Sequence, residues 1–281
     1  MKRSHFLKSL LAGASAISLP FALKGDKSPK ETQVGFEHLP LKEDKTMNTI
    51  IHRAGTRGHA NHGWLDSHHT FSFASYMNPE RMHFGALRVL NDDIIQGGTG
   101  FGTHPHANME IVSIPLKGAL EHKDSTGRHK VIETGDVQIM SAGSGIYHSE
   151  YNHHKDQATN FLQIWVFPKM GDIAPRYDQK NFDVKGRQNA WQTVVSPKEG
   201  EALWINQDAW FNLANLEKGK SLSYQKRKTE SVLYLFVIEG EVSVNGETLN
   251  KRDGMGIQVG DLKELNASED SELLLMELPN L

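Results

Sequence analysis

The chain has 281 residues, of which 38% are hydrophobic and 23% are charged, so it can bury the core of one large domain or of two smaller domains. Its formal net charge of −3 gives no general attraction to nucleic acid or to an anionic membrane, and we expect neither as a partner. The absence of cysteine excludes disulfides, thiolate nucleophiles and cysteine-ligated metal centres.

Residues 1–23 have the layout of a secretory signal peptide. Lys2, Arg3 and Lys8 form a basic start, and an apolar stretch with small residues follows. This stretch is too short for a membrane span, and Ser4 stands where a twin-arginine signal has its second arginine. We expect a degenerate twin-arginine-like leader and a periplasmic protein, with a cytoplasmic protein carrying an N-terminal tail as the alternative.

The rest of the chain has the pattern of a linker followed by an all-β fold. Residues 24–46 are charged, contain prolines and lack periodicity, which predicts a linker. Further on, short apolar runs predict strands at Phe84–Leu90, Glu110–Leu116, Val137–Met140 and Phe161–Phe167. Turn signals separate these runs at Asn91–Asp93, Gly97-Gly98, Ser125–Gly127 and Glu133–Asp136. Many short strands without long helical periodicity predict a sandwich or barrel.

Four histidines lie in the segment 58–73, namely His59, His62, His68 and His69. Any of them is close enough in sequence to the predicted sheet to reach a pocket. We favour the interpretation that they make local hydrogen bonds in a long ordered loop.

Two pairs of potential metal ligands follow. His104 and His106 form one pair, and His148 and Glu150 form the other; on an extended strand, residues i and i+2 point to the same face. Three imidazoles and one carboxylate suit a divalent transition metal. Glu110 is an alternative carboxylate, because it lies four residues after His106 on the same strand face. A chain with 15 histidines can carry some on its surface, but the second pair favours a shared site.

A weak internal repeat predicts two copies of one barrel. The run Glu110–Gly118 has a counterpart in Val232–Gly240, which Asn245-Gly246 follows as a type I′ hairpin signal. No histidine follows His154, so the second copy cannot rebuild the site of the first. Tyr177–Glu201, between the copies, is expected to be irregular and to contain the crossover.

These residues also carry a family resemblance. The motifs H-P-H-x-x-M-E from His104 and M-S-A-G-x-G-I-x-H-S-E ending at Glu150 resemble those of the pirin family of cupins, in particular its bacterial quercetinase-like members. The resemblance runs from about Asn48 to Leu281. It implies a bicupin, with two tandem double-stranded β-helix (jelly-roll) barrels. Residues 47–178 would form the metal-binding cupin domain and 179–281 a degenerate cupin domain.

The resemblance further implies the site and its chemistry. The metal would be held by residues matching His104, His106, His148 and Glu150. Generic cupins use a glutamate at the position of Glu110, which is here left as a pocket residue. Fe(II) is the expected metal, with Cu, Ni, Co, Mn or Zn as alternatives.

The activity that the resemblance implies is oxidation by O₂. Relatives oxidise the flavonol quercetin at its 2,3-bond and release carbon monoxide, so we expect a monomeric dioxygenase acting on a flavonol or a similar catechol or enediol. Glu150 would take the substrate's hydroxyl proton. The alternatives are a non-enzymatic, redox-responsive pirin that binds a regulatory partner, and a cupin that isomerises or binds a metabolite.

Overall fold

The computed structural model describes residues 48–281, so the predicted leader and linker lie outside the described residues. No helix in this range is long and apolar enough to cross a membrane. The elements are β1 (Thr49–His52), η1 (Ala54–Thr56), β2 (Gly58–Asn61), β3 (Leu65–His69), β4 (Leu87–Ile95), β5 (Gly100–His106), β6 (Glu110–Lys117), β7 (Ala119–Asp124), β8 (His129–Glu133), β9 (Asp136–Ser141), β10 (Ile146–Asn152), β11 (Thr159–Val166), β12 (Arg176–Asn181), η2 (Val184–Arg187), β13 (Gln192–Ser196), β14 (Leu203–Trp204), β15 (Trp210–Leu216), β16 (Ser221–Tyr224), β17 (Ser231–Glu239), β18 (Glu241–Val244), β19 (Glu247–Asn250), β20 (Gly254–Ile257), β21 (Leu262–Ala267) and β22 (Ser271–Pro279).

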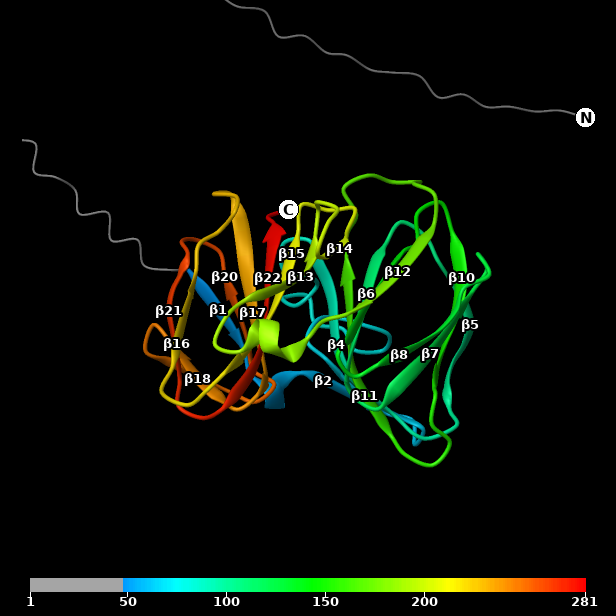
Figure 1. Cartoon of the computed structure of the whole chain (residues 1–281), viewed down its shortest axis with the longest axis horizontal. Helices are drawn as coiled ribbons and strands as arrows, with labels where there is room; N and C mark the ends of the chain where they lie inside the picture. Colours follow the sequence, from blue (N-terminus) through cyan, green and yellow to red (C-terminus); the bar gives the residue numbers. More distant parts are fainter. Residues whose placement is uncertain (1–47) are drawn as a thin grey trace, which may run out of the picture. The chain divides into compact units, whose positions relative to one another are not determined.

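The strands form two barrels, each built from a seven-stranded and a four-stranded sheet (Figure 1). In the N-terminal barrel the sheet orders are β12-β9-β6-β11-β4-β3-β2 and β5-β10-β7-β8. In the C-terminal barrel they are β1-β20-β17-β22-β15-β13-β14 and β16-β21-β18-β19. The expected all-β fold with two tandem jelly-roll barrels is confirmed.

The two seven-stranded sheets pack against each other and form one shared apolar core, the seam. Alternate residues of β17 serve different cores, as the period of two in a strand requires. Tyr234 and Phe236 join the seam with Ile139 and Ile164 of the N-terminal barrel. Leu235 points the other way, into the interior of its own barrel. The continuous apolar run of β17 is therefore buried on both faces, as its sequence indicates.

The two barrel interiors differ in polarity. In the N-terminal barrel, β11 places Leu162 in the seam but turns the neighbouring Gln163, which is 7% exposed, away from it. In the C-terminal barrel, the matching interior positions of β17 and β22 hold leucines such as Leu233 and Leu275. The first barrel therefore has an interior lined with polar groups, whereas the second is filled with apolar side chains.

The turn predicted at Asn91–Asp93 is wrong, because these residues lie inside β4 and are buried. Their polar side chains have partners that a single sequence does not reveal. Asp92 accepts hydrogen bonds from Arg252 Nε and Asn160 Nδ2, both at 2.8 Å. Since these partners replace water, the strand continues to Ile95. The observed strand, Leu87–Ile95, is therefore shifted toward the C-terminus relative to the strand expected at Phe84–Leu90.

Two segments expected to lack regular structure contain strands. The segment 58–73 forms the β2–β3 hairpin, and Tyr177–Glu201 contains η2, β13 and most of β12. The polar sequence of β12 fits its place at the edge of a sheet, where it pairs with β9 alone. Edge strands of this kind give a weak apolar alternation, which explains why the sequence did not predict it.

The hydrogen bonding also departs from the expected domain limits of 47–178 and 179–281. Strand β1 pairs with β20 and so belongs to a sheet of the C-terminal barrel, while β12 of the N-terminal barrel continues to Asn181. The hairpin signal at Asn245-Gly246 is confirmed, with φ values of 52° and 81° between β18 and β19.

Candidate metal centre

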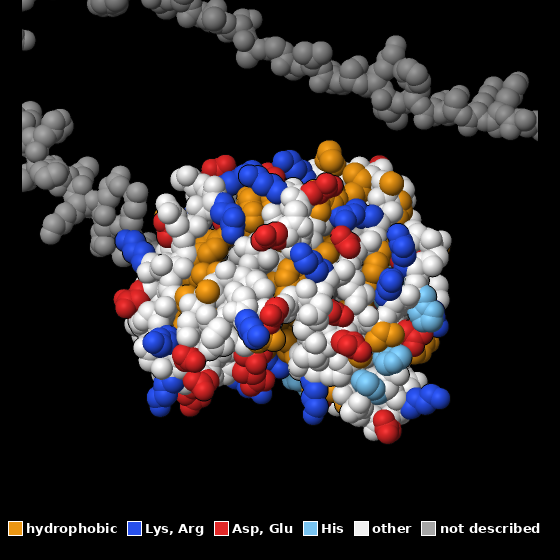
Figure 2. Space-filling view, in the orientation of Figure 1, with side chains coloured by type: hydrophobic (Ala, Val, Ile, Leu, Met, Phe, Trp, Pro, Cys, Tyr) orange, Lys and Arg blue, Asp and Glu red, His pale blue; other side chains and the backbone are white. Residues whose placement is uncertain are grey.

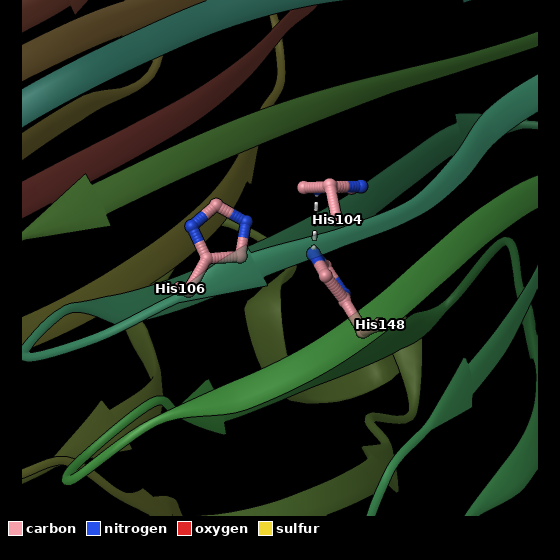
Figure 3. A group of neighbouring side chains, drawn as sticks. All are labelled: His104, His106 and His148. Carbon is pink, nitrogen blue, oxygen red and sulfur yellow. Dashed lines mark hydrogen bonds between the residues drawn. The ribbon is translucent and has the colours of Figure 1, made fainter.

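Three of the predicted ligands meet in the N-terminal barrel. β5 and β10 pair in antiparallel fashion with His104 opposite His148, and His106 lies two residues further along β5. Figure 3 shows the three imidazoles turned toward one another. The Nε2 atoms of His104 and His148 are 3.0 Å apart, and one nitrogen from each of the three rings lies within 4.8 Å of the others.

The donor atoms fit a transition metal. His104 donates its Nδ1–H to the carbonyl oxygen of Gly102 at 2.7 Å, which leaves the Nε2 lone pair facing the other two rings. Two nitrogens that are both about 2.0–2.1 Å from one metal lie about 3 Å apart when they are adjacent ligands. The observed Nε2–Nε2 distance matches this value. His148 Nδ1 is buried without a hydrogen-bond partner.

The protonation of the rings also suits a metal. Burial, followed by the neighbouring imidazoles, lowers the pKa of His106 to about 4 and that of His148 to about 3. Both rings are therefore neutral at pH 7, and a neutral imidazole is the form that binds a metal.

Glu150 lies beside this group but is not part of it. A β-bulge between His148 and Glu150 shifts the pairing of β10 with β5. The fully buried carboxylate of Glu150 accepts hydrogen bonds from Ser113 Oγ at 3.2 Å and Gln163 Nε2 at 2.9 Å. It lies within 4.8 Å of nitrogens of His148 and His122, which form a second group that overlaps the first.

His122 is a residue that the sequence analysis missed. It is fully buried, lies opposite Glu150 on β7, and contacts Asp124 Oδ2 through Nε2 at 2.9 Å. Its ring stacks on Tyr177 at 4.5 Å, and its Nδ1 is buried without a partner. The alternation of Leu120, His122 and Asp124 with charged residues was the available signal, since it places His122 on an inward face.

Glu110, the alternative carboxylate, is directed elsewhere. It is 1% exposed and accepts hydrogen bonds from Ser141 Oγ at 2.8 Å and from the backbone N–H of Asn206 at 3.2 Å. Burial raises the pKa of Glu110 to about 7. None of the groups of potential ligands found in residues 48–281 includes it.

A cavity of about 290 Å³ opens beside the imidazoles. His104 and His106 form part of its wall, and Trp165 packs edge-on against His106 with ring centroids 4.9 Å apart. The remaining apolar lining comes from Ala60, Leu65, Phe73, Ala74 and Phe101, and the remaining polar lining from His62, Ser67, His69, Ser75, Asp93 and Gln163. The cavity is thus mainly apolar with a polar side, as is common for sites that bind an aromatic small molecule.

Asp93 forms the buried corner of that polar side. Its carboxylate accepts a hydrogen bond from Ser67 Oγ, and burial raises the pKa of Asp93 to about 7. Next to it, the His69 ring contacts Asn91 Oδ1 through Nδ1 at 3.0 Å. Of the four histidines in segment 58–73, His62 and His69 line the cavity, whereas His59 makes a local contact of the predicted kind, with Asp66 Oδ1 at 2.8 Å from its Nε2.

Fold and site together define a two-barrel cupin with one imidazole-rich interior. Comparison with known proteins places it more closely: residues 50–166 match the Pirin family model, and residues 193–278 match the Quercetinase C-terminal cupin domain. The chain belongs to the pirin family.

Its relatives are similar along nearly their whole length. The chain is 43% identical over 235 residues to a quercetin 2,3-dioxygenase of Escherichia coli, covering 82% of this chain and 98% of that one. It is 44% identical over 222 residues to a pirin-like protein of Caulobacter vibrioides, covering 78% and 95%. The crystal structure of the bacterial pirin YhhW from Escherichia coli in complex with nickel(II) matches with a TM-score of 0.78 at 42% identity, covering 83% and 100%.

Proposed function

We propose that the protein is a metal-dependent dioxygenase that oxidises a flavonol, or a related catechol or enediol, with O₂. The observation that carries this proposal is the convergence of the imidazoles of His104, His106 and His148 beside a mainly apolar cavity, with His104 and His106 in its wall. The similarity to a quercetin 2,3-dioxygenase supports the choice of substrate class. The ligands that we propose are His104, His106, His148 and Glu150.

The metal would supply the redox chemistry that O₂ requires, with coordination positions left open beside the three imidazoles and one carboxylate. We propose Fe(II) as the native metal. The solved relative with nickel(II) supports a divalent first-row ion in general, and Cu, Co, Mn and Zn suit the same donors.

Glu150 is the residue to which we assign both ligation and proton transfer. Ser113 and Gln163 donate to its two oxygens and hold the carboxylate in one orientation next to His148. A carboxylate has about four acceptor positions, so two remain for a metal or for a substrate hydroxyl proton. Glu110 is engaged by Ser141 and Asn206 and is not proposed as a ligand.

The cavity would orient the substrate and exclude water from it. Aromatic side chains, including Phe73, Phe101 and Trp165, provide flat apolar walls, which suit a planar ring system. The polar side, with Ser67 and Asp93, provides partners for hydroxyl groups. A fixed orientation relative to the imidazoles lowers the entropic cost of reaction.

A turnover assay tests the proposal. Metal-reconstituted protein should consume quercetin and O₂ in air and release carbon monoxide, and a His104→Ala variant should not. Fully metallated protein that leaves quercetin and related catechols unchanged would refute the enzyme and favour a pirin that binds a partner without catalysis.

A further inference from the structure

We propose that the outer face of the β2–β3 hairpin is a second metal site, formed by His59, Asp66 and His68. The ion that binds there would be a divalent transition metal such as zinc, copper, nickel or cobalt. One donor atom from each of the three side chains lies within 4.8 Å of the others, in a group that shares no residue with the imidazoles of the barrel interior.

Strand pairing brings the three donors together. His59 lies directly opposite His68, and Asp66 lies two residues before His68 on the same face of β3. Asp66 Oδ1 is 2.8 Å from His59 Nε2 and 3.6 Å from His68 Nδ1. Donors held at about 2.0–2.2 Å from one metal lie about 3.0–3.4 Å apart, so each of these two distances is within a few tenths of an ångström of the required range.

The rings need one adjustment. The imidazoles of His59 and His68 are stacked, with centroids 4.4 Å apart and planes inclined by 17°, so each must turn before both lone pairs point at one ion. The side chain of His59 is 51% exposed and that of His68 is 36% exposed, which leaves room for this rotation. The same exposure lets water complete the coordination, as in zinc sites with three protein ligands.

The charges around the site permit a cation to bind but do not favour a high affinity. The positive charge of Arg57 acts on His68 and opposes a cation there. The charges of Arg57 and Arg252 are partly neutralised, because both guanidinium groups contact Asp92 at 3.6 Å and 2.8 Å. We therefore expect weaker binding than in the buried centre.

Because of its position on the β2–β3 hairpin, the site would affect the neighbouring cavity. β2 is the last strand of its sheet and pairs with β3 alone. The alternating residues Ala60, Ser67 and His69 of this hairpin line the cavity on the inner face, while the three proposed ligands lie on the outer face. An ion bound between β2 and β3 would therefore fix one wall of the cavity.

A matched control is available on β8. His129 is also exposed and also contacts a carboxylate, through Nε2 and Glu121 Oε1 at 2.7 Å. There, however, Lys123 Nζ lies 2.9 Å from the same oxygen, and its positive charge opposes a metal ion. His129→Ala removes a histidine of similar exposure without touching the proposed site.

The test is a zinc titration by calorimetry of the full chain with its central metal in place. We expect one additional equivalent in the wild type and in His129→Ala. In His59→Ala and in His68→Ala its affinity should fall by at least about tenfold, since even outer-shell changes cost that much. Elemental analysis after gel filtration checks that the central metal is retained.

The titration is repeated with His104→Ala plus His148→Ala, in which two proposed ligands of the central site are missing. One zinc equivalent should still bind and raise the melting temperature, because binding to the folded state stabilises it. A wild-type protein without an additional equivalent, or unchanged binding in both His59→Ala and His68→Ala, would overturn the proposal.

Discussion

Exchange of single carboxylates for amides separates the roles of Glu150 and Glu110. In Glu150→Gln the amide oxygen can still accept from Gln163, and the new NH₂ group can donate to the hydroxyl of Ser113. In Glu110→Gln the amide oxygen can replace the one carboxylate oxygen that accepts from both Ser141 and Asn206. Both variants should therefore fold, and each removes one negative charge and one proton acceptor.

The expected effects differ in size. If Glu150 takes the substrate proton, its loss should lower kcat by about 10²–10⁴-fold, which is the usual value of general acid–base assistance and corresponds to about 3–5 kcal/mol. Among residues 48–281, Glu110 belongs to none of the groups of potential ligands, so Glu110→Gln should change kcat by less than about tenfold, although outer-shell changes reach about 100-fold in some metal sites.

The assay is steady-state turnover of quercetin under air, with both variants compared at equal metal occupancy. Equal occupancy is necessary because loss of a carboxylate ligand also weakens metal binding. Fully metallated Glu150→Gln with normal turnover, beside an inactive Glu110→Gln, would show that the two carboxylates have been assigned the wrong way round.

Three further predictions rest on the structure, and a fourth rests on the sequence of residues 1–23 alone. Burial raises the pKa of Glu110 from 4.5 to about 7, so its neutral form stabilises the fold below pH 4.5, and this contribution, about 3 kcal/mol or less, is lost as pH rises to 7. Glu110→Gln should therefore raise the melting temperature more at pH 8 than at pH 5; an equal shift would contradict this. Elemental analysis of protein purified without added metal should find close to one equivalent, and His104→Ala plus His148→Ala should lose it. Expression of residues 47–180 alone should give an aggregating product, because the seam is exposed; a soluble, metal-loaded monomer would count against this. Mass spectrometry of native protein should show removal of the first 20-odd residues, and an intact Met1 on cytosolic protein would end the export prediction.

The sequence predicted the fold well where apolar runs are long. β6, β9, β11 and β17 lie within a residue or two of the apolar runs that predicted them, because strands buried in a core need continuous hydrophobic surface. The prediction from sequence failed where the buried side chains are polar. Asn91–Asp93 has the composition of a turn, and only the partners Asn160 and Arg252, distant in sequence, make a buried strand of these residues possible.

The site was predictable to the extent that it depends on strand alternation. The i,i+2 spacing of His104 and His106 brings both rings to one point, and the pairing of β5 with β10 adds His148. The β-bulge between His148 and Glu150 in the pairing of β10 with β5 is not encoded in any spacing, and the pairing of β10 with β7 places Glu150 opposite His122. His122 itself comes from β7, and nothing local in the sequence links that strand to β10.

The difference between the two barrels has a physical reason. An interior that holds imidazoles, carboxylates and amides cannot also be a large apolar core, and the apolar clusters confined to the N-terminal barrel are small. Most of the apolar surface of its large sheet is buried instead in the seam, against the C-terminal barrel. The interior of the second barrel is lined with apolar side chains such as Leu233 and Leu275, so it has an apolar core of its own and presents the other face of β17 to the seam. The large sheet of the second barrel is thus apolar on both faces, and its seam face covers the apolar face of a sheet whose other face is partly polar.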